Sequence, residues 1–139
     1  NLDYIIVDMP PGTGDTQLTF TQDIMVDGAI IVSTPQDMAL LDVKRGIQMF
    51  EKTKINIIGL VDNMSFFKGD DGKEYKIFGE GGVKKTAEEF NKEFLGEIPL
   101  NPEVGKSGDN GKPIVEENPN HEISKIYINF AKKIKSTYL

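Results

Sequence analysis

Two kinds of stretch alternate along the chain in their pattern of hydrophobic and polar positions. Short aliphatic runs, each followed by proline, glycine or a polar cluster, predict buried β-strands. Longer stretches with apolar residues three and four positions apart predict helices. Strands are expected at residues 4–7, 28–33, 55–61 and 94–99, and helices at residues 16–25, 35–52, 82–92 and from about 120 onward. This alternation predicts an α/β fold with a doubly wound, mostly parallel sheet.

Local signals set several boundaries. Thr34 is predicted to cap the second helix, with Pro35 at its first helical position. An Asp-Gly step at residues 71–72, between flanking aromatic residues, predicts a hairpin. Residues 105–113 are rich in glycine and lysine and are expected to form a mobile loop. The last helix carries an apolar stripe that favours packing on the sheet. A basic amphipathic membrane anchor is the alternative.

The strongest candidate for chemistry is the segment that follows the first aliphatic run. Asp8 ends this run, and two prolines and two glycines come directly after it. Proline removes a backbone donor and glycine permits positive φ, so the chain is expected to leave the sheet here as a loop. A carboxylate at the carboxyl end of a parallel strand lies where open α/β sheets bind ligands. A plain strand-terminating turn is the alternative interpretation.

Asn63 is the second candidate, because it follows the predicted third strand. A side-chain amide both donates and accepts hydrogen bonds, so it can read the edge of adenine that carries an amine and ring nitrogens. Many asparagines at strand ends only cap a turn, and the residue type alone leaves that reading open.

Composition narrows the class of protein. The chain has 139 residues, a formal charge of −6 and no cysteine. A net negative charge argues against nucleic acid as a partner, because neutralising phosphates needs a basic surface. The same net negative charge disfavours binding to an anionic membrane. No apolar run in the sequence approaches the ~20 residues of a membrane span. Without cysteine the chain forms no disulfide. A cytoplasmic location is expected.

The motifs DMPPGTGD, STPQDMALLD, VDNMSFF and FLGEIPL together resemble the Mrp/ApbC branch of P-loop ATPases, which are relatives of MinD and ParA. That family is associated with iron–sulfur cluster assembly or transfer. The resemblance implies ATP and Mg²⁺ as cofactors, with Asp8 on the magnesium side through a water molecule. Pro11 and Gly12 would belong to the loop that senses the phosphate, and Asp15 would position water or contact the partner subunit.

The same resemblance assigns two residues to the binding of the adenine base. Asn63 would contact adenine, and Pro99, at the end of FLGEIPL, would help to wall the adenine pocket. It also implies slow ATP hydrolysis at the interface of a homodimer in the full-length protein, with iron–sulfur apo-proteins as possible targets. Catalysis in such a site rests on positioning and on charge neutralisation.

The sequence departs from the family pattern in two ways. No GxxxxGK[ST] phosphate-binding motif occurs in the 139 residues, so residues 1–139 are expected to be the carboxyl-terminal portion of one ATPase domain, inactive alone. The Cys-x-x-Cys pair typical of the family is replaced by Gly69 and the turn at residues 70–72, which puts an iron–sulfur cluster in doubt. A MinD- or ParA-like positioning ATPase and a non-catalytic interaction scaffold stay open as alternatives. The strand that carries Asp8 is expected to have an unpaired apolar edge, which would make the chain marginally stable or self-associating.

Overall fold

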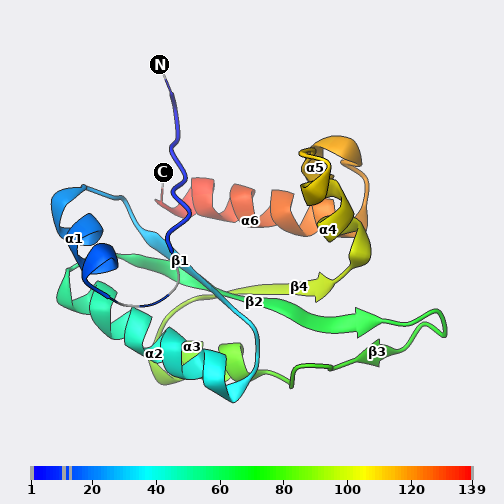
Figure 1. Ribbon diagram of the computed structural model, residues 1–139, viewed down its shortest axis with the longest axis horizontal. Helices are drawn as coiled ribbons and strands as arrows, with labels where there is room; N and C mark the ends of the chain where they lie inside the picture. The colour runs from blue at the N-terminus through cyan, green and yellow to red at the C-terminus, as the bar shows by residue number, and fades with distance from the viewer. Residues whose placement is uncertain (1, 11, 13, 139) are drawn as a thin grey trace.

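The computed structural model describes residues 2–10, 12 and 14–138. Helices and strands alternate over most of the chain (Figure 1), and the described elements are α1 (Asp15–Asp23), β1 (Ala29–Ser33), α2 (Asp37–Lys52), β2 (Ile57–Lys68), β3 (Glu74–Tyr75), α3 (Gly82–Glu89), β4 (Phe94–Leu100), α4 (Pro102–Asp109), α5 (Ile114–Glu117) and α6 (Glu122–Tyr138). The predicted α/β class with a mostly parallel sheet is confirmed.

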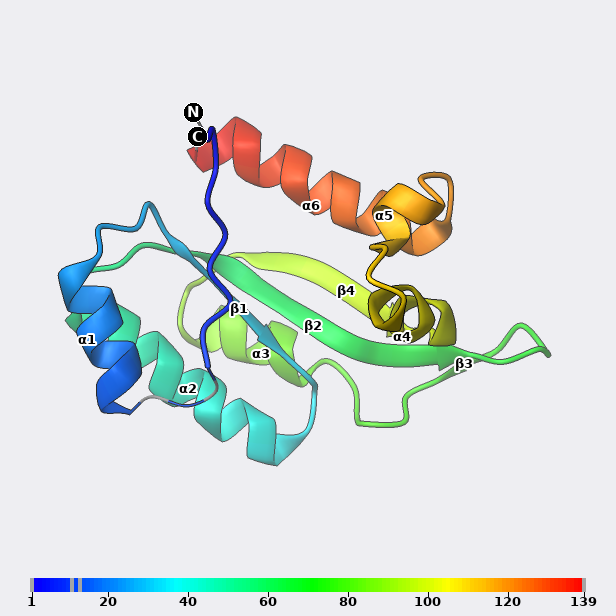
Figure 2. The same ribbon diagram turned by 45° about the horizontal axis from the view of Figure 1, so that its top comes forward.

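Strand β2 lies at the centre of the sheet. It pairs in parallel with β1 on one side and with β4 on the other, and its far end pairs antiparallel with β3. Helices α2 and α3 lie against one face of this sheet and α6 lies against the other (Figure 2). Because parallel strands must be covered on both faces, β2 reads as a continuous aliphatic run from Ile57 to Val61.

Each face of the sheet has its own apolar core. On the first face, α2 contributes Val43 and Ile47, and α3 contributes Val83 and Ala87, which pack around Leu60 of β2. Ile47 and Leu60 are fully buried, and complete burial of one such side chain stabilises a fold by about 1.5–3 kcal/mol. The apolar residues of β2 on this face are therefore held by two helices.

The second core joins β4 and β2 to the carboxyl-terminal helices. Ile123 at the start of α6 is fully buried and packs with Val61 of β2 and Ile98 of β4. Phe130, further along α6, packs against the same cluster. The last helix thus covers the sheet, as its stripe predicts. Among the described residues no helix is long and apolar enough to cross a membrane.

The first predicted strand is wrong. Residues 2–10 contain no strand, and the side chains of Ile5 and Ile6 are 76% and 95% exposed. The ring of Tyr4 instead lies 6.0 Å from the ammonium nitrogen of Lys135 near the end of α6. An aliphatic run forms a strand only where a neighbouring strand supplies backbone partners, and here the run has none.

Other boundaries also differ from the prediction. Helix α2 begins at Asp37 after Gln36, without a side-chain cap, so the predicted cap at Thr34 lies too early. Strand β2 continues seven residues past Val61, because β3 and β4 extend the ladder that the sequence could not show. The helix predicted at residues 16–25 ends earlier, at Asp23, and the side chain of Met25 is fully exposed.

The expected mobile loop at residues 105–113 is largely helix. Asn101 accepts a hydrogen bond from the backbone N–H of Glu103 at 2.8 Å, and Pro102 occupies the first turn of α4. Asparagine followed by proline is a helix-start signal, so the sequence did carry the information. His121, at the start of the last helix, accepts a hydrogen bond from the N–H of Ile123 and lies 3.3 Å from the carboxylate of Glu103.

Strand β1 pairs with a strand on one side only, within the part of the chain that the structure describes. On the face turned toward α6 it exposes Ile30 and Val32 by 42% and 58%. We therefore expect the purified chain to self-associate, and Val32→Lys to shift it toward monomer, because a lysine on an edge strand opposes pairing. Sedimentation velocity over a concentration series measures this shift.

The matched control is Ile77→Lys, which places lysine at a side chain of similar exposure, 56%, outside the sheet. It is expected to leave the association unchanged. A wild-type chain that stays monomeric throughout the series would contradict the prediction.

Candidate functional site

The carboxyl edge of the three-stranded parallel part of the sheet lies where β1 ends at Ser33, while β2 and β4 continue to Lys68 and Leu100. The register pairs Ser33 of β1 with Asp62 of β2, and Asp62 with Glu97 of β4. The next pair is Asn63 with Ile98, so Asn63 lies on the strand beside Pro99. The structure thus brings together the two residues predicted to surround a base. In open α/β sheets ligands bind outside this edge of the strands.

The backbone of β2 is irregular directly after Asn63. Met64 has φ of 55°, and the register with β4 shifts between Asn63 and Phe67. The hydroxyl of Ser65 donates to the carbonyl of Ile98 at 3.3 Å and ties the two strands together across the irregularity. A left-handed conformation costs a residue with a side chain about 1 kcal/mol or more. Such irregularities re-aim side chains and are frequent beside functional sites.

Asp62 is the residue that the sequence analysis missed. Its side chain is 1% exposed, and its Oδ1 atom has no hydrogen-bond partner among the described residues. Burial and, to a smaller extent, the nearby carboxylate of Glu97 raise the pKa of this carboxyl to about 6, against the opposing effect of the Lys76 ammonium. The signal for Asp62 in the sequence was its position directly after the aliphatic run of β2.

The predicted phosphate and magnesium residues lie in a different part of the molecule. Asp8 is exposed on the extended amino-terminal segment, and Asp15 is the first residue of α1. Gly12 has φ of 104°, which glycine adopts without strain, while Pro11 lies outside the described residues. Figures 1 and 2 both show α1 beside the amino ends of the strands, away from α4. Asp15, which begins α1, therefore lies away from the end of β4 that leads into α4.

In the β2–β3 hairpin the carboxylate of Asp71 is hydrogen-bonded within the turn. Asp71 accepts from the N–H of Lys73 at 3.0 Å and from the hydroxyl of Tyr75 at 2.8 Å. The hydrogen bond from the N–H of Lys73 is the larger cause that lowers the pKa of Asp71, and the bond from the Tyr75 hydroxyl is the next. The same bond to Asp71 raises the pKa of Tyr75. In the described part of the chain no three His, Asp or Glu side chains gather to hold a metal.

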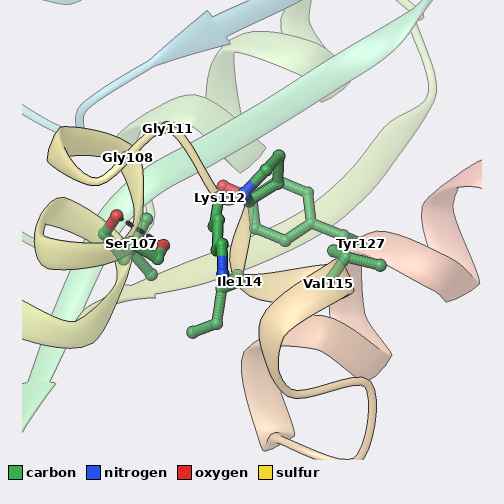
Figure 3. A pocket seen from close by; sticks show the side chains of 9 residues that line it. Ser107, Gly108, Gly111, Lys112, Ile114, Val115 and Tyr127 are labelled. Atoms are coloured by element: carbon green, nitrogen blue, oxygen red, sulfur yellow. Dashed lines mark hydrogen bonds between the residues drawn. The ribbon is translucent and has the colours of Figure 1, made fainter.

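Two surface pockets among the described residues are further candidate sites. One of about 420 Å³ lies between α4, α5 and α6 (Figure 3), and its lining is mainly apolar, with Ile114, Val115 and Tyr127 beside Lys112. The other, of about 640 Å³, lies between the start of α2 and the start of α3 and has Phe78 and Met38 in its wall. Neither pocket is lined by Asn63 or Pro99.

Comparison with known proteins identifies the class. The fold resembles solved P-loop NTPases. A nucleotide-binding protein from Archaeoglobus fulgidus in complex with ADP superposes with a TM-score of 0.74 at 38% identity, over 88% of this chain and 50% of that one. The cell division ATPase MinD from Pyrococcus furiosus gives a TM-score of 0.61 at 20% identity, over 79% and 43% of the two chains, which shows the fold alone.

The family follows from sequence. The model of the ParA family, described as NUBPL iron-transfer P-loop NTPase, matches residues 1–135, and the chain belongs to this family. Iron-sulfur cluster carrier proteins of Aquifex aeolicus and Escherichia coli are 43% and 45% identical, over 95% and 96% of this chain. That of Deinococcus radiodurans is 52% identical over 85%. The chain spans 33–37% of the length of these relatives.

The buried carboxyl of Asp62 makes a prediction about pH. In the folded state Asp62 keeps its proton up to about pH 6, whereas in the unfolded state it keeps the proton only up to about pH 3.8. The free energy of unfolding is therefore expected to fall as the pH rises from about 4 through 6. A difference of about two pKa units corresponds to at most about 3 kcal/mol. Asp62→Asn is expected to remove this loss in urea titrations at pH 4.5 and 8.

Asp70→Asn is the matched control, because Asp70 is an exposed acid on the hairpin. Its substitution leaves burial unchanged and should preserve the wild-type slope with pH. Identical slopes for wild type and Asp62→Asn would contradict the assignment.

Proposed function

We propose that this chain supplies the base-binding portion of an adenine-nucleotide site in an ATPase that serves iron–sulfur cluster assembly or transfer. The observation that carries the proposal is the placement of Asn63 and Pro99 on neighbouring strands at the carboxyl edge of the sheet. Membership of the iron-transfer family and the structural relative in complex with ADP support it.

The chemistry of the base site follows from the residues present. The amide of Asn63 offers one acceptor and two donors, which match the amine and ring nitrogens of adenine. Pro99, half-buried on the neighbouring strand β4, is the apolar residue proposed to wall the base. Ser65 fixes the spacing of the two strands through its bond to Ile98. These groups bind and orient the base, and they leave the phosphates to other residues.

Asp8 is the residue proposed for the magnesium side, as the family resemblance implies. Mg²⁺ keeps most of its waters and binds to proteins through one or two carboxylates together with nucleotide phosphates. The carboxylate of Asp8 is exposed on the amino-terminal segment, and no contact within the described residues engages it. When bound, the ion would neutralise phosphate charge, and Asp8 would hold it through water. Asp15 is the further acid proposed to position water or face a partner subunit.

The output of the whole protein is also a proposal. Hydrolysis of ATP at the interface of a homodimer would change the loop that contains Pro11 and Gly12 and so signal to an iron–sulfur apo-protein. An iron–sulfur cluster would be the cargo that the whole protein transfers. The chain has no cysteine, so none of its own thiolates can hold one. This composition also favours the second candidate, an interaction scaffold that keeps the fold.

Asn63→Ala tests the base site. Loss of a hydrogen bond to the base is expected to weaken ADP binding about tenfold, since such a bond contributes about 1.5 kcal/mol. NMR titration of the labelled chain with ADP and with GDP measures both affinity and selectivity. Asn56→Ala is the control, because Asn56 is exposed at the opposite end of the same strand.

Two outcomes would count against the base site. One is unchanged ADP affinity in Asn63→Ala, and the other is equal affinity of the wild-type chain for ADP and GDP. Either result would favour the scaffold.

Asp8→Asn tests the magnesium role. Removing the charge is expected to abolish the gain in ADP affinity that Mg²⁺ produces, while leaving affinity without Mg²⁺ unchanged. The control is Asp3→Asn, a second exposed acid on the same segment. Titration calorimetry with and without Mg²⁺ reports the difference. A magnesium effect that survives in Asp8→Asn would remove Asp8 from the site.

A further inference from the structure

Strand β1 has the composition of an inner strand but lies at the edge of the sheet. Residues 29–32 are aliphatic at every position, which is typical of parallel strands that are covered on both faces. In the described part of the chain, however, β1 pairs only with β2. The backbone N–H and C=O groups on its outer edge are therefore available to another strand.

The outer edge of β1 lacks the usual protection against such a strand. Exposed edges are commonly guarded by lysine, by proline or by an inward charge, and residues 29–33 contain none of these. Ile30 and Val32 are 42% and 58% exposed on one face. Ile31, on the other face, packs against the core formed by α2 and α3. An added strand would therefore meet apolar neighbours on both faces.

The amino-terminal segment has the complementary features. Residues 4–7 form an apolar run that is not part of a strand, and Ile5 and Ile6 are 76% and 95% exposed. In an extended strand Tyr4 and Ile6 would lie on one face and Ile5 and Val7 on the other. Both faces of the run are therefore apolar, as an inner strand of a covered sheet requires.

Contacts near its two ends hold this segment to its own chain among the described residues. The ring of Tyr4 lies 6.0 Å from the ammonium nitrogen of Lys135, and the side chain of Gln17 donates to the carbonyl of Pro10 at 3.1 Å. The first contact is long and at the surface, so its loss costs little. Residues 4–7 can therefore leave their own chain while α1 keeps its position.

We propose that residues 4–7 of one copy of this chain add as a parallel strand to the outer edge of β1 in a second copy. The second copy is the occupant because it carries the matching apolar run, and because the run of each chain leaves its own β1 unpaired. Each copy donates one segment and receives one, so the exchange closes as a dimer. The exchange itself does not rest on the proposed function.

The exposed side chains indicate the direction and register of the added strand. An uninterrupted apolar run favours the parallel direction. Setting residues 4–7 against residues 30–33 places Ile6, the most exposed side chain of the run, beside Val32, the most exposed side chain of β1. Val7 then lies beside Ser33, because aligned residues of neighbouring strands point to the same face.

This register has a consequence for the candidate site. Asp8 follows Val7, so it would lie just past Ser33, at the edge where Ser33 pairs with Asp62 of β2. Ligands of open α/β sheets bind outside this edge. One copy would then supply its magnesium-side carboxylate to the site of the other copy. This consequence, unlike the exchange, rests on the proposed function.

Engineered cysteines test the exchange without any nucleotide. The chain has no natural cysteine, so two mixed single-cysteine variants form disulfides only at the chosen positions and only between chains. Val7→Cys with Ser33→Cys is expected to give at least about fivefold more mixed disulfide than Val7→Cys with Ala29→Cys, because Cβ atoms must lie within ~4.5 Å and the two β1 positions are ~13 Å apart. Ala29 is the matched control, since both positions are half-buried on the same face of β1.

Several results would overturn the proposal. Equal yields from the two mixtures would indicate random collision, and an excess at Ala29 would indicate an antiparallel strand. The absence of mixed disulfide in both mixtures would also overturn it. If the double variant Val7→Cys/Ser33→Cys links within one chain while the mixtures give nothing, the run pairs with its own β1 instead.

Sedimentation of lysine variants gives a second test that does not depend on the cysteines. Ile6→Lys is expected to leave the fold intact, because this side chain is 95% exposed. It should raise the dimer dissociation constant as much as Val32→Lys does, and the double variant should add little more, since both changes remove one contact. Ile77→Lys is again the control.

An unchanged dissociation constant in Ile6→Lys would contradict the exchange. The exchange and the role proposed for Asp8 can fail separately. If the mixed disulfide forms but the effect of Mg²⁺ on ADP affinity survives in Asp8→Asn, the role of Asp8 is refuted and the exchanged strand stands.

Discussion

The structure depends on the burial of β2 on both faces and along both edges. Two cores, one under α2 and α3 and one under α6, meet through Leu60 and Val61 of this strand. The pairing with β1 and β4 sets every other strand in register with it. The polar residues Asp62 and Asn63 begin where this aliphatic run ends, still inside the ladder. Their positions are therefore as fixed as those of the core, which a binding site requires.

Most of the fold could be predicted from the sequence because its signals are local. Helices α2, α3 and α6 follow from apolar spacing, and β4 follows from an aliphatic run stopped by proline. The run at residues 4–7 failed because strand formation depends on a partner that the pattern does not contain. Helix α4 was missed for a different reason. Asn101 and Pro102 form a helix-start signal, but the glycines that follow favoured a loop.

The candidate site was only partly predictable. Asn63 and Pro99 came from recognisable motifs, and the parallel register explains why they lie on neighbouring strands. Asp62 was overlooked because an acid at the end of an aliphatic run usually means that the strand has ended. Only the long ladder of β2 shows that this carboxyl is buried. Relatives that are 43–52% identical support the family.

The central claim is that the carboxyl edge of the sheet, at Asn63, binds the adenine base. The most direct test follows the side-chain amide resonances of Asn63 and Asn56 while ADP is added to the labelled chain. The account predicts saturable shifts of the Asn63 amide and none of the Asn56 amide at the opposite end of β2. Equal shifts of both amides, or none at Asn63 while other residues respond, would contradict it.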